Sequence, residues 1–372
     1  VEDFATADIA ELAEIERETV HDVKAVEYYL KRRLPGVLDT GASDAGSDAD
    51  ALAELIHFCC TSEDVNNLSY ALMVRGAVTQ VWLPAATGLV DALAAMAHEL
   101  ADVPLLAHTH GQPATPTTMG KELGVLAHRL RRQLRRIEGA ECLGKLNGAT
   151  GTFGAHLAAV PEADWPQISR AFVEGLGLTW NPLTTQIESH DWQAELYADI
   201  ARFNRILHNL CTDVWTYISM GYFAQVRGQG TVGSSTMPHK VNPIRFENAE
   251  ANLEVSTALL DVLAATLVES RMQRDLTDST VLRNIGVALG PILGGIALSS
   301  NYNIGFIAAA ATLSFYGLIT LFFLRETLVR DPNAKPETLK QQIRVYRQAL
   351  RNKPFAHMVG AFTLMEICAA LM

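Results

Sequence analysis

The segment RGQGTVGSSTMPHKVNP, residues 227–243, brings together residue types that could support proton removal beside a carboxylate. Such a reaction builds negative charge on the carboxylate, so cationic and N–H groups must be in place to stabilise it. Lys240 and a helix N-terminus near Asn242 could supply those groups. Three glycines give the segment backbone freedom. The serine pair taken alone would fit an ordinary loop between two helices equally well.

A second segment, AHTHGQPATPTTMGKE at 107–122, places a histidine before a Gly-Gln-Pro break. His110 is therefore expected in an exposed setting, and histidine gains and loses a proton near neutral pH, as a general acid must. A lone histidine is more often structural than catalytic. Thr115 and Pro116 are expected to act as the N-cap and first residue of a helix that runs to about residue 138.

A third segment, IHFCCTSEDVNN at 56–67, carries helix-capping residue types. Thr61 and Ser62 could cap the next helix, and Glu63 and Asp64 suit the positive end of its dipole.

Taken together, and in their order along the chain, these segments resemble the fumarase/aspartase superfamily. Within it, TSEDVNN, THGQPATPTT and QRDLTDSTVLRN are most similar to the adenylosuccinate lyase family. Fumarases carry Gly where His239 stands, and argininosuccinate lyases carry Gln. The resemblance implies that Ser235 is the base and that His110 protonates the leaving nitrogen. Because a free serine is a poor base, Ser235 would need activation by loop closure and nearby positive charge.

The resemblance also implies substrate contacts. Two histidines match family positions that line the nucleotide phosphate or support the general acid. A Thr-Ser pair matches a site for a substrate carboxylate, and Gln186 matches a glutamine near the succinyl group. Two arginines and a serine match the site for the phosphate and ribose. The implied contacts are His21, Asp22, His57, Thr61, Ser62, Thr109, Gln112, Gln186, Lys240, Asn242, Arg274, Ser279 and Arg283. Asn147-Gly148 matches a segment of small residues beneath the site.

For the molecule as a whole, the family implies a homotetramer in which three subunits build each active site, without metal or cofactor. Its substrates would be adenylosuccinate and the succinylated carboxamide ribonucleotide of purine and AMP biosynthesis.

Helical periodicity is expected to position these residues. Helix-period apolar residues occur at 7–34, 50–58 and 64–100, with a polar loop at 35–50. Long helices are expected at 191 to about 226 and from about 243 to 270, the latter with Asn242 as N-cap. The fold class is therefore all-α, a long-helix bundle. Its expected domains are a partial N-terminal helical domain at 1–110 and the bundle with its signature loop at 111–284.

The composition is acidic, with 41 Asp and Glu against 30 Lys and Arg and a net charge of −11. This balance argues against a nucleic-acid-binding protein. It is compatible with an anionic small-molecule substrate that binds in a local basic pocket. The five cysteines lack zinc spacing and indicate buried thiols in a reducing compartment. The chain starts without Met or a signal-peptide pattern and lacks the family's N-terminal Arg-Tyr contact, so we expect it to be truncated there.

The C-terminal part differs in character, because no Asp, Glu, Lys, Arg or His occurs between Arg283 and Arg325. Apolar stretches at 285–300, 303–324 and 354–372 predict about three transmembrane-like helices. The glycine pattern at 284–295 resembles the fifth transmembrane helix of major facilitator superfamily transporters. The expectation is a chimera with a seam within about 281–290, in which 285–372 replaces the family's third domain and contacts an inner or plasma membrane.

Three functions stay open on the sequence alone. The first is an active adenylosuccinate-type C–N lyase, cytoplasmic in its lyase part. The second is a catalytically inactive, chimeric, membrane-associated protein. The third is another fumarate-releasing lyase of the superfamily.

Overall fold

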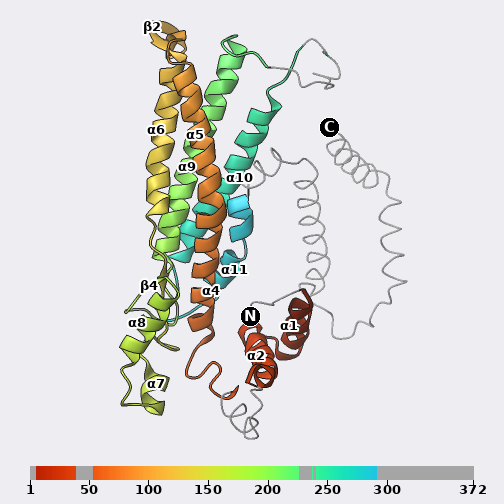
Figure 1. Ribbon diagram of the computed structural model, residues 1–372, viewed down its shortest axis with the longest axis vertical. Coiled ribbons are helices and arrows are strands. Elements are labelled where there is room, and N and C mark those ends of the chain that lie inside the picture. The colour runs from red at the N-terminus through yellow and green to blue at the C-terminus, as the bar shows by residue number, and fades with distance from the viewer. Residues whose placement is uncertain (1–5, 39–52, 226–236, 238–239, 291–372) are drawn as a thin grey trace, which may run out of the picture. The chain divides into compact units, whose positions relative to one another are not determined.

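A computed structural model describes residues 6–38, 53–225, 237 and 240–290, all within one compact unit, Val1–Gly305. These residues are mostly helical, as predicted, with a two-stranded antiparallel sheet and a two-stranded parallel sheet (Figure 1). The elements are α1 Thr6–Thr19, α2 Asp22–Leu38, α4 Ser62–Ala77, η1 Val78–Trp82, α5 Leu83–Glu99, β1 Pro104–Thr109, β2 Gln112–Thr118, α6 Met119–Glu138, β3 Leu143–Gly144, α7 Gly154–Ala159, α8 Trp165–Gly175, β4 Thr179–Trp180, α9 Asp191–Ser219, α10 Ile244–Leu267 and α11 Thr277–Leu282.

Four long helical segments pack side by side in the described unit: α4–α5, α6, α9 and α10 (Figure 1). Their shared core is built from aliphatic residues and the large aromatic residues Trp82, Trp192, Tyr197 and Phe203. The rings of Trp82 and Phe203 meet edge to face, 5.0 Å apart, and both residues are almost completely buried. Aromatic pairs in this geometry stabilise a core beyond their buried area. The bundle therefore provides a rigid frame for the segments at its ends.

The helix expected at 64–100 is confirmed as the continuous run Ser62–Glu99, with one π-helical turn, η1, inside it. Among the described residues this run is long and apolar enough to cross a membrane by length and composition, a criterion that buried core helices also meet. Here Trp82, Ala86 and Val90 are at most 1% exposed within the bundle core. The run therefore acts as a central strut of the bundle.

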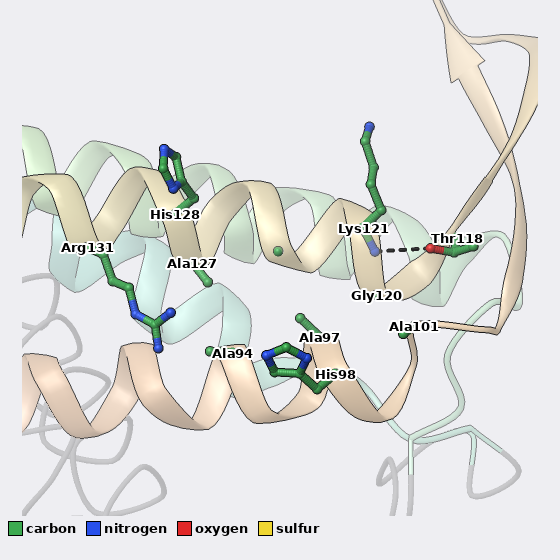
Figure 2. A pocket seen from close by; sticks show the side chains of 11 residues that line it. Ala94, Ala97, His98, Ala101, Thr118, Gly120, Lys121, Ala127, His128 and Arg131 are labelled. Carbon is green, nitrogen blue, oxygen red and sulfur yellow. Dashed lines mark hydrogen bonds between the residues drawn. The ribbon is translucent and has the colours of Figure 1, made fainter.

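The predicted helix start at Thr115-Pro116 is wrong, because residues 112–118 form strand β2 instead. Pro116 pairs with Leu106 of β1 in an antiparallel hairpin. Proline disfavours helical backbone in the residue before it, and Pro113 and Pro116 together keep this segment extended. Helix α6 begins at Met119, where the Thr118 hydroxyl accepts a hydrogen bond from the Lys121 amide at 3.2 Å (Figure 2). The predicted end near residue 138 is confirmed.

The two long helices predicted at 191–226 and 243–270 are confirmed, but their ends differ from the predicted ones. Helix α9 ends at Ser219 rather than near 226, and Gly221 follows at φ +76°, a conformation that favours glycine and ends helices. Helix α10 starts at Ile244 with Pro243 as N-cap, so the predicted cap at Asn242 is wrong by one residue. It ends at Leu267.

At the N-terminus, the helical pattern at 7–34 divides into α1 and α2, with Val20 between them at φ +52°. The helix expected at 50–58 is not confirmed for residues 54–59, which form turns. His57 and Cys59 lie in the left-handed region there, at φ +65° and +57°. Two left-handed residues so close together are incompatible with a right-handed helix.

An open groove of about 390 Å³ lies between α5 and α6 (Figure 2). Small residues line its floor and let the helices approach closely. A Cβ on Gly120 would lie 2.2 Å from the Ala97 carbonyl oxygen, so only glycine fits there. His98, His128 and Arg131 line the polar side of the groove. No predicted site residue lines it.

The first residues of the apolar stretch predicted at 285–300 lie inside the described unit. Ala288 and Leu289 are buried in the bundle core, and the Ser256 hydroxyl of α10 donates to the Ala288 carbonyl at 2.5 Å. Residues 291–372 lie outside the described residues. The apolar stretches 303–324 and 354–372 therefore stay predictions. The domain boundaries at 110 and 284 also stay predictions, because neither divides the compact unit that contains the described residues.

Candidate active site

Two groups of predicted site residues that the structure describes lie at opposite ends of the Ser62–Glu99 helix. Thr61 precedes its first residue, whereas the β1–β2 hairpin that carries His110 follows its last turn (Figure 1). A helix of 38 residues is about 57 Å long at 1.5 Å per residue. The Thr61 end and the His110 end of one chain are therefore too far apart to act on one small substrate.

At the α4 end, Thr61 is the N-cap and Ser62 the first helical residue, as the sequence predicts. Asp64 accepts a hydrogen bond from the Thr61 amide at 2.8 Å, which closes the first turn. Both capping residues are half-buried. The free N–H groups of such a helix start attract anions.

The Asp64 carboxylate also binds a second segment of chain. It accepts hydrogen bonds from the amides of Asn147 at 3.1 Å and Gly148 at 3.2 Å, and it lies 2.8 Å from the Lys145 ammonium. Gly148 stands at φ +82°, which a larger residue adopts only with strain. The small-residue segment is thereby held directly against the start of α4.

Two further polar contacts extend this end of the bundle. The side-chain amide of Asn147 donates to the Thr184 hydroxyl at 2.8 Å, and the side-chain amide of Gln186 donates to the Ala149 carbonyl at 2.9 Å. The Asn147 side-chain oxygen is buried and has no hydrogen-bond partner among the described residues. The structure thus places Gln186 against the Asn147–Ala149 segment, which Asp64 holds at the start of α4.

Arg274 is held by two buried carboxylates rather than left open. Its guanidinium donates to Asp278 at 2.6 Å, to Glu63 at 3.0 Å and to the Ser279 hydroxyl at 2.9 Å. Burial raises the pKa of Glu63, and the Arg274 charge opposes that rise. The predicted phosphate ligands Arg274 and Ser279 therefore lie together beside α4, and their expected role is still a prediction. Arg283 is exposed.

His190 completes this cluster from the loop before α9. It is buried, stands at φ +60°, and its Nε2 lies 3.3 Å from Asp278. Burial alone would lower the pKa of His190, but the hydrogen bond to Asp278 and the nearby Glu188 carboxylate raise it. The same contact lowers the pKa of Asp278 against the effect of its burial. His190 and Asp278 thus form a buried hydrogen-bonded pair that ties α11 to the bundle.

Of the N-terminal candidates His21, Asp22 and His57, His21 contacts the start of α4 directly. The His21 ring lies 3.4 Å from the Ser62 hydroxyl, which brings two predicted contacts together. Asp22 accepts from the Val23 amide at 2.7 Å at the start of α2. The Nε2 atom of His57 is buried without a partner among the described residues, beside a mainly aliphatic cavity of about 330 Å³ between α2, α4 and α8.

At the opposite end, His110 and Gly111 form the two-residue tip of the β1–β2 hairpin. Both have positive φ, +54° and +72°, as a tight hairpin turn requires. Thr109 and Gln112 pair on either side of this turn, and all four residues are exposed. A histidine in this strained position at an exposed tip is presented outward, as the predicted general acid would have to be.

The signature loop is described only in part. Ser235 lies outside the described residues, so its expected role stays a prediction. Lys240 is exposed, and its amide donates to the Met237 carbonyl at 3.2 Å. Asn242 is half-buried just before α10. Among the described residues, no group of three or more His, Cys, Asp and Glu side chains is arranged to hold a metal ion.

Asp275 gives a testable pH dependence at this site. Its carboxylate accepts from the backbone amides of Thr277 at 2.8 Å and Arg271 at 2.9 Å, which lower its pKa to about 2. Because the pKa of Asp275 is lower in the folded state than in the unfolded state, where it is about 4, the ionised carboxylate stabilises the fold at any pH above about 4. This contribution to stability disappears as the pH falls toward 2. We expect Asp275→Asn to lower the melting temperature at neutral pH. That difference from wild type should shrink between about pH 5 and pH 3, and an equal difference at both ends of the range would contradict the assignment.

Sequence reasoning missed the buried charges that connect these segments. Lys145, Glu63 and Asp278 are at most 4% exposed, and each contacts a partner that is distant in sequence. Only Glu63 and Asp64 carried a signal, as acidic residues suited to a helix start. Lys145 in GKLNG and Asp278 in LTDST have no periodicity or spacing that would mark them as buried.

Comparison with known proteins places the chain among lyases. A sequence model described as Lyase matches residues 1–255. Adenylosuccinate lyase of Escherichia coli K12 is 53% identical over 290 residues, covering 78% of this chain and 62% of the relative. Adenylosuccinate lyase of Vibrio cholerae is 46% identical over 354 residues, covering 95% of this chain and 72% of the relative, so that alignment continues past the predicted seam. This chain thus spans less than two thirds of the E. coli relative.

The fold has solved counterparts as well. The crystal structure of a fumarate lyase from Mesorhizobium sp. BNC1 superimposes with a TM-score of 0.62 at 18% identity, covering 79% of this chain and 63% of that one. At this identity the likeness concerns the fold alone.

Proposed function

Because the chain belongs to the adenylosuccinate lyase branch of the fumarase/aspartase superfamily, we propose that it eliminates fumarate from adenylosuccinate. The succinylated carboxamide ribonucleotide of purine biosynthesis is the second proposed substrate. We place the lyase part in the cytoplasm.

The proposal is carried by the grouping of predicted anion contacts around the start of α4. Thr61 and Ser62 lie at this helix start, and buried hydrogen bonds from Asp64 hold the Asn147-Gly148 segment against it. Gln186 joins from a third segment through an exposed hydrogen bond to the Ala149 carbonyl. Arg274 and Ser279 adjoin the same helix start through Glu63. This arrangement suits a substrate that carries two carboxylates and a phosphate.

In the proposed reaction, Ser235 removes the proton from Cβ of the succinyl group. The electron pair moves to form the fumarate double bond, and the bond from Cα to nitrogen breaks. His110 donates a proton to the departing nitrogen. Negative charge that develops on the neighbouring carboxylate would be stabilised by Lys240 and by helix N–H groups.

The distance between the two ends of the α4–α5 helix supports a shared active site. Since one chain separates Thr61 from His110 by this helix, we propose that a homotetramer completes each site with residues of other subunits. Buried residues recur every three or four positions along the α4–α5 helix, which leaves part of its surface exposed. Met73, Val81, Leu89 and Met96 of the α4–α5 helix are 41–58% exposed, an apolar surface suited to burial against another copy.

Fumarate release, followed by absorbance with several candidate substrates, tests this function. The proposal predicts turnover of adenylosuccinate and none of argininosuccinate, malate or aspartate. Release from one of the other three with none from adenylosuccinate would assign the chain to a different superfamily activity.

Membrane association of the C-terminal residues is a separate proposal, supported by the uncharged run between Arg283 and Arg325. Burial of Ala288 and Leu289 in the core favours placing any membrane segment after Gly290. We expect the chain to stay with the membrane fraction after a high-salt wash and to be released by detergent. Recovery in the aqueous fraction would contradict this proposal without affecting the lyase assignment.

A further inference from the structure

Lys145 is a completely buried lysine to which the reaction above gives no role. Its side chain is 0% exposed, and its ammonium lies 2.8 Å from Asp64 and 3.2 Å from the Gly148 carbonyl. Removing a lysine and an aspartate from water is costly even when they pair, and apolar residues of similar volume would often be as stable. Burial lowers the pKa of Lys145, and the Asp64 carboxylate opposes this effect. A reason other than stability is therefore needed for this pair.

The pair connects two predicted parts of the substrate site. Asp64 binds the Thr61 amide on one side and the Asn147 and Gly148 amides on the other. Lys145 belongs to the second segment, and its own amide donates to Asn67 of α4 at 2.9 Å. One buried carboxylate therefore sets the position of Thr61-Ser62 relative to Asn147, and the Lys145 ammonium, 2.8 Å away, holds that carboxylate in place.

Charge gives the pair a second effect. Glu63 and Asp64 place two buried carboxylates in the first turn of the helix whose start is proposed to bind an anion. Arg274 is paired with Glu63, and Lys145 with Asp64. Without Lys145, an uncompensated negative charge would lie beside the proposed carboxylate site at low local dielectric, where repulsion is strong.

We infer that Lys145 is a positioning residue for the dicarboxylate half of the substrate, acting through Asp64 on Thr61, Ser62 and Asn147. This inference rests on the proposed function. The inference predicts different effects on the binding of the two products, because fumarate carries the two carboxylates of the succinyl group whereas AMP carries neither.

The test compares product inhibition of adenylosuccinate turnover in wild type and Lys145→Met. We expect the inhibition constant of fumarate and the KM of adenylosuccinate to rise at least about tenfold, while the inhibition constant of AMP and kcat change less than about threefold. A merely structural role would lower the amount of folded enzyme and leave all these constants unchanged. Arg136→Met is the matched control: it removes a cation from Asp199, which keeps Arg202, and it should alter none of the constants.

If Lys145→Met does not fold, the neutral pair Asp64→Asn/Lys145→Met takes its place. A single amide oxygen cannot serve the three amides that Asp64 binds, so the fumarate constant should still rise. Fumarate inhibition within twofold of wild type in either folded variant would overturn the inference, and so would an equal rise for AMP. An inactive wild-type enzyme would instead overturn the proposed function, on which the inference rests.

Discussion

Replacing His110 with asparagine is expected to lower kcat for fumarate release by about 10²- to 10⁴-fold, the range that a general acid contributes. His110 is at φ +54° in the hairpin tip, and asparagine is among the few residues that tolerate this backbone conformation. The variant should therefore keep the β1–β2 hairpin while losing the group that protonates the leaving nitrogen. Alanine would add backbone strain to the loss of the imidazole and is the poorer choice.

His108→Asn provides the control on the same hairpin. His108 lies in β1, where its ring contacts the Leu106 carbonyl at 3.1 Å, and it carries no proposed role. The His108→Asn variant should retain at least about half of wild-type activity, because substitutions of exposed residues outside the site and the core have small effects. A His110→Asn enzyme within threefold of wild type would show that another group protonates the leaving nitrogen.

Mixing two inactive variants is expected to restore activity, because the two ends of the α4–α5 helix would serve different active sites. Ser62→Asp places a negative charge at the helix start, where the dipole favours it, while repelling a substrate carboxylate. Co-expressed with His110→Asn, it should give hybrids in which some sites receive both intact residues. With random assembly and one such residue from each of two subunits, about one quarter of the sites would be intact.

The double variant Ser62→Asp/His110→Asn, co-expressed with His110→Asn, serves as the control and should stay inactive. The hybrid composition would be established by native mass spectrometry. Hybrids that contain both chains in equal amounts and recover no activity would contradict the shared site.

The sequence supported the helical frame well, because long amphipathic segments have one dominant solution. The run Ser62–Glu99 and the end of α6 near residue 138 follow from apolar periodicity and capping residues. The β1–β2 hairpin was missed because Thr115-Pro116 fits a helix start as well as a strand, and only pairing with Leu106 decides between them. The end of α9 was misplaced because the local pattern continues past Gly221, whose positive φ breaks the helix.

Site residues were predictable where their motif also has a local structural role. Thr61 and Ser62 were expected at a helix start and lie there. The partners of Arg274 were not predictable, because Glu63 lies 211 residues away and meets it only after the bundle has formed. Lys145 was missed for the same reason: its burial depends on Asp64, and lysine in a glycine-flanked segment usually indicates a surface loop.

The most direct test measures fumarate release from adenylosuccinate by the purified chain beside its Ser235→Ala variant. Release by wild type that falls by several orders of magnitude in the variant is the result we predict, since the proposed base would be lost while the bundle is untouched. Equal release by both proteins would contradict the assigned base. No release by a folded, assembled wild-type protein would contradict the proposed lyase activity itself.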